Sequence, residues 1–161
     1  MRHRHSLVKF MVMAALLVIG VTTASVVSAA SVDDVDASTV TKKRSAVTKL
    51  AKKQVGKSYV YGAAGPNSFD CSGLVQYVYK KAGDKVLPRT TYSQVTVGKK
   101  VSLNKLKKGD LLFWGSADSP YHVGIYVGGN KYVHAATPDQ GVRKQTISTY
   151  FYPSAAKRVL E

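Results

Sequence analysis

The stretch Phe69-Asp70-Cys71-Ser72-Gly73-Leu74-Val75 holds the only cysteine of this 161-residue chain. Asp70 is a residue type that caps helix N-termini, and the following pattern predicts a helix from Asp70 to Ala82 that ends at Gly83. Cys71 then lies at a helix start, where unpaired N–H groups favour a thiolate and lower the pKa of a thiol. The stretch therefore predicts a nucleophilic cysteine.

Histidines further along the chain bear on this interpretation. A lone cysteine taken by itself also fits a buried small hydrophobe or an intermolecular disulfide. His122 and His134 follow on neighbouring strand-like segments, whereas His3 and His5 lie near the N-terminus. One thiol and two imidazoles form a minimal Cys-His-His nucleophilic site. For His134 taken alone, a surface or structural role fits equally well.

The turn between these two histidines provides a geometric test. Gly128-Gly129-Asn130 predicts a hairpin with a three-residue turn, which places His134 opposite Gly124. Side chains alternate along a strand, so His122 and His134 then project from the same sheet face, whereas a two-residue turn would separate them. In the favourable register, one imidazole can orient the other toward Cys71.

The rest of the chain predicts an α+β domain. Apolar residues at helical spacing predict a first helix from Arg44 to Val55, and a loop rich in Tyr and Gly follows from Tyr59 to Phe69. Short runs of β-forming residues predict strands at 110–114, 122–127, 132–136 and 157–160. We expect N-terminal helices packed on one side of a small antiparallel sheet.

The first 30 residues predict a secretory signal peptide. Basic residues precede an uninterrupted apolar run at 10–21, and Ser28-Ala29-Ala30 offers small residues for cleavage. The apolar run is short for a membrane span, and hydroxyl-bearing residues follow it. We therefore expect an exported protein without a permanent membrane anchor.

The exported part has a simple predicted organisation and a strong charge. Residues 31–42, rich in Ser, Thr, Asp and Val, predict a flexible tail, and residues 43–161 predict one catalytic domain. The formal net charge is +15, which favours binding to anionic wall polymers, although charge alone also fits a solvated surface without a specific partner. The lysines are scattered and no nucleic-acid-binding signature is present, so we expect no nucleic-acid partner.

Other chemistries are poorly represented in the sequence. One Cys and two His could bind zinc, but the chain lacks a C-x-x-C or H-E-x-x-H pair, and we expect neither a metal nor a cofactor. No G-x-S-x-G motif supports a serine nucleophile.

A series of segments in order carries a family resemblance. They are Tyr59-Val60-Tyr61-Gly62, Gly65-Pro66, 69–75, Leu87-Pro88-Arg89-Thr90-Thr91-Tyr92-Ser93-Gln94, 106–114, His122-Val123-Gly124-Ile125-Tyr126-Val127-Gly128 and Tyr132-Val133-His134-Ala135. From about Lys49 to Leu160, the chain resembles the catalytic domain of the NlpC family of papain-like cell-wall peptidases. The resemblance implies a papain-like fold with the nucleophilic cysteine at a helix N-terminus.

The resemblance also implies roles for individual residues. Cys71 would be the nucleophile, His122 the general base and acid, and His134 the residue that orients His122. Tyr59 would help to line the oxyanion site together with backbone N–H groups near Cys71.

Substrate contacts follow from the resemblance with less specificity. Asp70 and Ser72 match positions that contact the stem peptide in some members, a role that competes with helix capping. Arg89 and Gln94 match a block that borders the groove, where packing and loop structure explain them equally well.

The implied reaction is hydrolysis of peptidoglycan stem peptides, most often between γ-D-glutamyl and the diamino acid, through a thioester. The partners implied are these stem peptides, and we expect a secreted, wall-associated monomer from a Gram-positive bacterium. Two alternatives remain open: an amidase or acyl transferase on the same fold, and a catalytically idle, cationic wall-binding protein.

Overall fold

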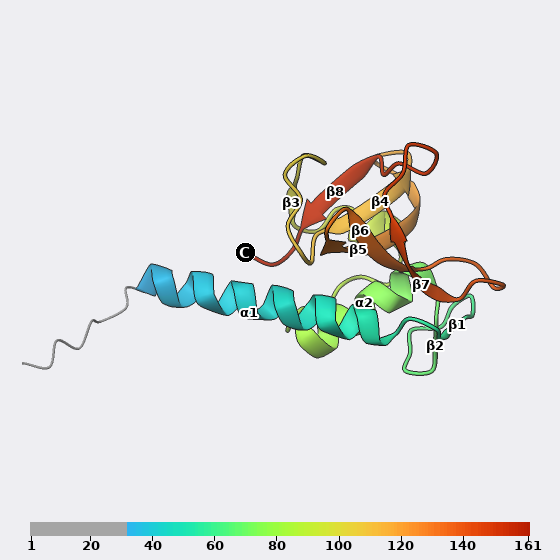
Figure 1. Ribbon diagram of the computed structural model, residues 1–161, viewed down its shortest axis with the longest axis horizontal. Helices are drawn as coiled ribbons and strands as arrows, with labels where there is room; N and C mark the ends of the chain where they lie inside the picture. The colour runs from blue at the N-terminus through green and yellow to red at the C-terminus, as the bar shows by residue number, and fades with distance from the viewer. Residues whose placement is uncertain (1–31) are drawn as a thin grey trace, which may run out of the picture.

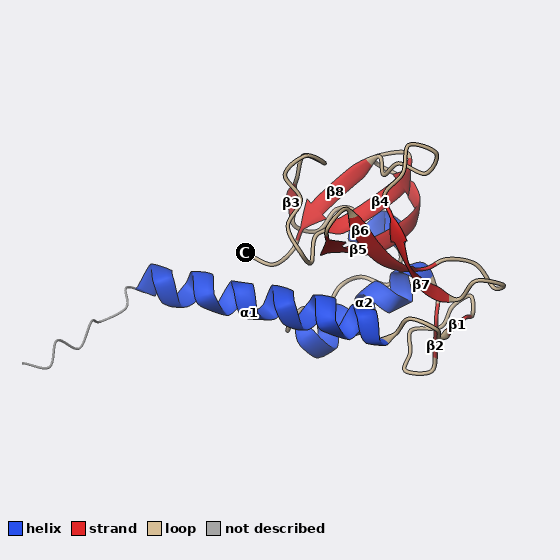
Figure 2. Ribbon diagram, viewed as in Figure 1, coloured by secondary structure: helices blue, strands red, loops and turns tan. Residues whose placement is uncertain are grey.

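Three helices, a six-stranded sheet and a separate two-stranded sheet make up the computed structural model, which describes residues 32–161; the predicted signal peptide lies outside these residues. The helices are α1 (Val32–Lys53), α2 (Cys71–Ala82) and α3 (Thr91–Gln94). The strands are β1 (Ser58–Tyr59), β2 (Ser68–Phe69), β3 (Lys99–Lys100), β4 (Leu111–Gly115), β5 (Pro120–Gly128), β6 (Lys131–Ala135), β7 (Val142–Thr146) and β8 (Ala155–Arg158). Helices come first and strands later, which confirms the predicted α+β class (Figures 1 and 2).

The main sheet has six antiparallel strands in the order β3-β8-β4-β5-β6-β7. Helix α2 packs against β5 and β6, and α1 lies beside α2 (Figure 1). Val75 and Val78 of α2 share a buried apolar core with alternate residues of β5 and β6, such as Val123 and Val133. Burial of this face fixes the start of α2 relative to the sheet.

The other face of the sheet carries a smaller aromatic cluster. Leu112, Trp114 and Tyr132 are buried there, and Phe151 packs against them. Trp114 pairs with His122 in the β4–β5 ladder, so both side chains lie on this second face. The two histidines predicted to be catalytic thus come from the strands that also build the aromatic cluster.

Helix α2 begins and ends as predicted. The Asp70 carboxylate accepts a hydrogen bond from the Gly73 N–H at 2.7 Å, and the N–H of the C-cap residue Gly83 bonds to the Tyr79 carbonyl. Gly73 also allows a close approach, because a Cβ at this position would lie 2.1 Å from the Ala63 carbonyl oxygen. The loop after β1 therefore packs directly on the start of α2.

The hairpin of β5 and β6 brings both histidines to one face by a different route from the predicted one. Gly128 pairs with Lys131, so the tip contains only Gly129 and Asn130, both with positive φ. A register shift between Tyr126 and Gly128 inserts one extra residue. The three-residue turn was wrong, but the bulge restores the register that the prediction required.

Two other predictions need correction. The chain is helical from Val32 rather than from Arg44, so residues 32–42 are not the irregular tail that their composition predicted. Most residues from Asp34 to Lys42 are exposed and Val40 is only half-buried, so this part of α1 lacks the buried apolar stripe on which the prediction relied. The short strands β1, β2, β3 and β7 and the short helix α3 were also missed, because their sequences show no apolar run. Within residues 32–161, no helix has the length and apolar character needed to cross a bilayer.

Candidate active site

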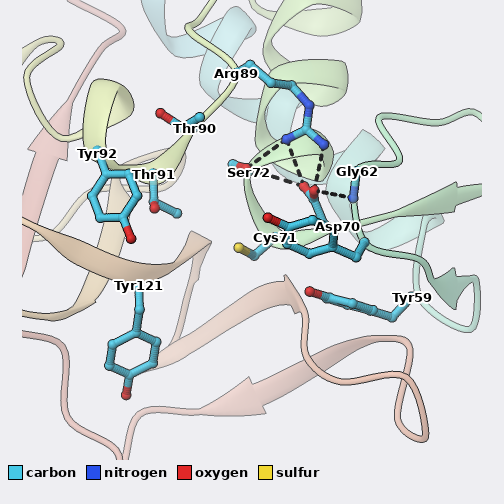
Figure 3. A pocket seen from close by; sticks show the side chains of 11 residues that line it. Tyr59, Gly62, Asp70, Cys71, Ser72, Arg89, Thr90, Thr91, Tyr92 and Tyr121 are labelled. Atoms are coloured by element: carbon cyan, nitrogen blue, oxygen red, sulfur yellow. Dashed lines mark hydrogen bonds and ion pairs between the residues drawn. The ribbon is translucent and has the colours of Figure 1, made fainter.

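Two adjoining clefts meet at Cys71 and share Tyr59 and Tyr121. The first, which we call the arginine cleft, has a volume of about 380 Å³ and is also lined by Tyr61, Asp70, Ser72, Arg89, Thr91 and Tyr92 (Figure 3). The second, which we call the histidine cleft, has a volume of about 460 Å³ and is also lined by His122, His134, Thr137, Gln140, Gln145 and Phe151. An extended chain that crosses Cys71 can therefore occupy a cleft on either side of the thiol.

Cys71 is the first residue of α2 and is only partly exposed. Burial raises the pKa of its thiol, and the neighbouring Asp70 carboxylate raises it further. The backbone N–H groups of Val123 and Ser72 act in the opposite direction but do not offset this rise. The lowered pKa expected for a cysteine at a helix start is therefore wrong, and the resting group is a thiol.

His122 and His134 are both buried and contact each other directly. Nε2 of His122 lies 2.7 Å from Nδ1 of His134, and Nε2 of His134 contacts Oε1 of Gln145. Burial lowers the pKa of both imidazoles, and for His122 the proximity of His134 lowers it further. Both rings are therefore neutral at neutral pH, and Nδ1 of His122 remains for the cleft that contains Cys71.

Aromatic rings hold the histidines in place. The Trp114 ring lies 5.5 Å from the His122 ring and stacks on Phe151 with a centroid distance of 4.9 Å and an interplanar angle of 9°. The indole N–H of Trp114 donates to the Phe151 carbonyl at 3.2 Å, which holds the two stacked rings beside the histidines. The aromatic cluster thus excludes water from one side of the imidazole pair.

The three residues predicted to bind substrate form one network in the arginine cleft (Figure 3). Arg89 donates to both carboxylate oxygens of Asp70, at 2.9 and 2.5 Å, and to Oγ of Ser72 at 2.8 Å. Burial alone would raise the pKa of Asp70, but hydrogen bonds from Arg89, Gly73 and Gly62 lower it overall. Asp70 is thus an ionised cap that joins α2 to the loops on either side.

Tyr59 ends β1 and lines both clefts. Its hydroxyl points into the cleft beside Cys71 (Figure 3). Burial raises the pKa of this phenol, and the nearby Cys71 raises it further, so the hydroxyl stays protonated and can donate a hydrogen bond. This is the property required of an oxyanion-site donor.

The site combines a cysteine at a helix start, two histidines on one hairpin and a tyrosine between two clefts. The model of the NlpC/P60 family matches residues 56–161 of the chain. The chain belongs to the NlpC/P60 family. The resemblance drawn from the motifs is thereby confirmed, together with the fold that it implied.

Known NlpC/P60 proteins include relatives from several bacteria. The chain is 42% identical over 97 residues to a protein of Listeria monocytogenes named "Probable endopeptidase p60", and the match covers 60% of this chain and 19% of that protein. It is 42% identical over 82 residues to the Escherichia coli protein named "Murein DD-endopeptidase MepS/Murein LD-carboxypeptidase", with 51% of this chain and 44% of that protein covered. The chain thus spans less than half of the length of these curated relatives.

The solved structures include a similar NlpC/P60 domain. The crystal structure of the NlpC/p60 domain of the peptidoglycan hydrolase SagA is 38% identical, with a TM-score of 0.67. The match covers 71% of this chain and 97% of that domain. The six-stranded sheet with Cys71 at the start of α2 is therefore the NlpC/P60 fold.

Two glutamines of this NlpC/P60 domain stand out. Gln94 is fully buried and donates to the carbonyls of Ser72 and Pro88 at 3.0 and 2.8 Å, so it joins α2 to the Arg89 loop rather than facing substrate. Gln145 was missed, because it lies on the polar edge strand β7, which no apolar run reveals. Among the described residues, no group of three or more His, Cys, Asp or Glu side chains could hold a metal ion.

Proposed function

We propose that the protein is a secreted cysteine endopeptidase that hydrolyses the stem peptides of peptidoglycan. The observation that carries this proposal is the position of Cys71, where the two clefts meet beside the neutral His122–His134 pair. The names of the relatives support it, since one is a probable endopeptidase and another a peptidoglycan hydrolase. Cys71, His122 and His134 are the proposed catalytic residues.

The proposed reaction begins with a proton transfer. Nδ1 of His122 accepts the thiol proton while Sγ of Cys71 attacks the scissile carbonyl carbon, and the carbonyl electrons move to oxygen. The Tyr59 hydroxyl and backbone N–H groups near Cys71 stabilise this oxyanion. The C–N bond then breaks, His122 gives the proton to the leaving amine, and the acyl group stays on Sγ of Cys71 as a thioester.

Water completes the cycle in the same site. His122 removes a proton from water as the water oxygen attacks the thioester carbon, the C–S bond then breaks to release the carboxylic acid product, and Sγ of Cys71 takes the proton back from His122. Since the pKa of Cys71 is raised and that of His122 is lowered, the proton moves during the attack rather than before it. Closely placed clefts on both sides favour this timing, because bound substrate excludes water from the proton path.

The two clefts suggest how the stem peptide is placed. We assign the acyl part of the substrate to the arginine cleft, where Asp70, Ser72 and Arg89 offer fixed opposite charges and a hydroxyl. The leaving amine then lies in the histidine cleft near Thr137 and Gln140. The bond proposed for cleavage joins γ-D-glutamyl to the diamino acid.

Other bonds and other chemistries are the competing candidates. The name of the E. coli relative includes both a DD-endopeptidase and an LD-carboxypeptidase, so a different bond of the same polymer is a specific second candidate. An amidase or acyl transferase would use the same thioester. A catalytically idle wall-binding protein would need neither the imidazole pair nor Tyr59.

One experiment separates these candidates. The purified protein and its Cys71→Ala variant are incubated with peptidoglycan, and the released fragments are identified by mass spectrometry. We expect products cut between D-glutamate and the diamino acid with the wild type and none with the variant. Fragments cut elsewhere would reassign the bond, and intact peptidoglycan that retains both proteins, together with intact soluble muropeptides, would favour the wall-binding alternative.

The proposed location follows from the sequence. A signal peptide at residues 1–30 would export the protein, and its net charge of +15 would hold it on anionic wall polymers. The Listeria relative named above and two more from Corynebacterium support a Gram-positive source, although the E. coli relative comes from a Gram-negative bacterium. We expect binding to teichoic-acid-bearing walls to weaken as salt rises, because screening reduces such attraction.

A further inference from the structure

Gln145 ends a chain of three polar side chains that begins at His122. Its Oε1 contacts Nε2 of His134, and Nδ1 of His134 lies 2.7 Å from Nε2 of His122. The three side chains come from the successive strands β5, β6 and β7 of one meander. Gln145 also lines the histidine cleft, where its side chain contacts His134.

An amide oxygen can only accept a hydrogen bond, and this dictates the protons along the chain. Nε2 of His134 must carry the proton that it donates to Gln145, so Nδ1 of a neutral His134 has a lone pair. That lone pair accepts from Nε2–H of His122. Nδ1 of a neutral His122 is then unprotonated, which is the state that a base facing Cys71 requires.

We propose that Gln145 is a positioning residue that fixes the tautomers of both histidines and thereby presents a lone pair at Nδ1 of His122. The kinetic consequence rests on the proposed cysteine-peptidase function, whereas the tautomers exist and can be measured without turnover. A donor in place of the amide oxygen would reverse every proton in the chain and leave N–H on the base.

The neutrality of Gln145 is as important as its oxygen. A carboxylate at this position would favour a charged His134, which would donate from both nitrogens and force the proton of His122 onto Nδ1. The surroundings oppose such a charge: burial lowers the pKa of His134 by more than the hydrogen bond to Gln145 raises it, and Arg143, directly opposite it on β7, lowers it further. The other titratable side chains around the pair, among the described residues, are Cys71 of α2, Tyr59 of β1, Tyr121 of β5 and Tyr132 of β6.

Imidazole ¹⁵N chemical shifts test the inference directly, because they distinguish the protonated nitrogen of each ring. The spectra use histidine-labelled protein in which His3→Gln and His5→Gln leave only the two imidazoles of interest. We expect both rings to carry the proton on Nε2 in this protein. With Gln145→Met, which keeps the length of the side chain and removes the acceptor, we expect mixed or reversed tautomers.

Activity provides the second measurement. We expect Gln145→Met to lower kcat by at least about tenfold with little change in KM, because a wrong tautomer disables the base without removing substrate contacts. Gln145→Glu should retain activity at high pH and move the acid limb of the pH profile upward, since a carboxylate raises the pKa of His134. Lys144→Met is the matched control, since this neighbour on β7 is exposed and faces the other way.

The outcomes separate this inference from the proposed function. Unchanged tautomers and unchanged kcat in Gln145→Met would overturn the positioning role. If Gln145→Met changes the tautomers but neither the wild type nor the variants hydrolyse peptidoglycan, the positioning role is supported and the peptidase proposal is overturned. If Gln145→Met does not fold, the pH profile of Gln145→Glu decides, and an acid limb that stays in place contradicts the inference.

Discussion

Arg89 donates hydrogen bonds to both oxygens of the Asp70 carboxylate, with Nη1–Oδ1 and Nη2–Oδ2 distances of 2.9 and 2.5 Å. The same carboxylate caps α2 through Gly73 and holds the N–H of Gly62 at 2.9 Å. It also lies next to Cys71 and raises the pKa of that thiol. The residue that caps α2 therefore opposes ionisation of the thiol at the first position of that helix.

Removal of this charge should make the thiol more acidic. Asp70→Asn keeps an oxygen that can cap α2 but removes the anion, so we expect the pKa of Cys71 to fall. The rate of alkylation by iodoacetamide as a function of pH measures this change. The exposed Asp84, paired with Lys43, provides the control Asp84→Asn, which should leave the titration in place. If the pH midpoint of Cys71 alkylation in Asp70→Asn is unchanged or higher, the Asp70 charge does not raise the pKa of the thiol.

The pH profile of peptidoglycan hydrolysis should have a wide plateau. The active form has a thiol and a neutral imidazole, so activity is lost at low pH when the imidazole pair takes a proton and at high pH when the thiol ionises. Because the pKa of His122 is lowered and that of Cys71 is raised, the acid limb of kcat/KM should lie below pH 6.5 and the basic limb above pH 9.0. Rapid, pH-independent alkylation of the thiol between these limits would instead indicate a preformed thiolate–imidazolium pair.

Tyr59 should act on the chemical step. Tyr59→Phe removes the hydroxyl that we place at the oxyanion and leaves the ring in the cleft, so kcat should fall about a hundredfold while KM changes little. Steady-state kinetics on a defined stem peptide checks this. Tyr150→Phe removes the same group from a fully exposed side chain and serves as the control. A higher KM with an unchanged kcat would make Tyr59 a substrate contact only.

Gly73 should tolerate no side chain. A Cβ at this position would lie 2.1 Å from the Ala63 carbonyl oxygen, so Gly73→Ala must push the loop after β1 away from α2. We expect a loss of about 2 kcal/mol in the free energy of unfolding and a larger loss of activity, because Tyr59 at the end of β1 directly precedes that loop. Urea unfolding followed by circular dichroism gives the first value. A variant with wild-type stability would show that the loop yields at little cost.

The sequence predicted the parts of the fold that combine a local signal with burial. Helix α2 was predicted with both of its caps, because Asp70 and Gly83 bracket an apolar face that packs on the sheet. The central strands β4, β5 and β6 were predicted because their core residues are β-forming and apolar. The first part of α1 was missed because its exposed residues leave no periodic trace.

The candidate site was predicted in its residue types but not in its electrostatics. Cys71, His122, His134 and Tyr59 meet at the two clefts, since motif order placed them on the right elements. Burial, which depends on tertiary packing, raises the pKa of Cys71, whereas the sequence had predicted a lowered value. Gln145 could not have been found, because nothing in the local sequence of β7 distinguishes it from a solvated polar residue.

The thiol and its proposed base belong to two different parts of the molecule. Cys71 begins α2, whereas His122 and His134 lie on β5 and β6, and Val75 of α2 and Val123 of β5 share the apolar core between helix and sheet. The packing of this core therefore sets the distance over which a proton must pass between the Cys71 thiol and the His122 imidazole. Adding or removing a single methyl group in this core would change the distance between the thiol and the imidazole, and with it the reaction rate, while every proposed catalytic side chain stays intact.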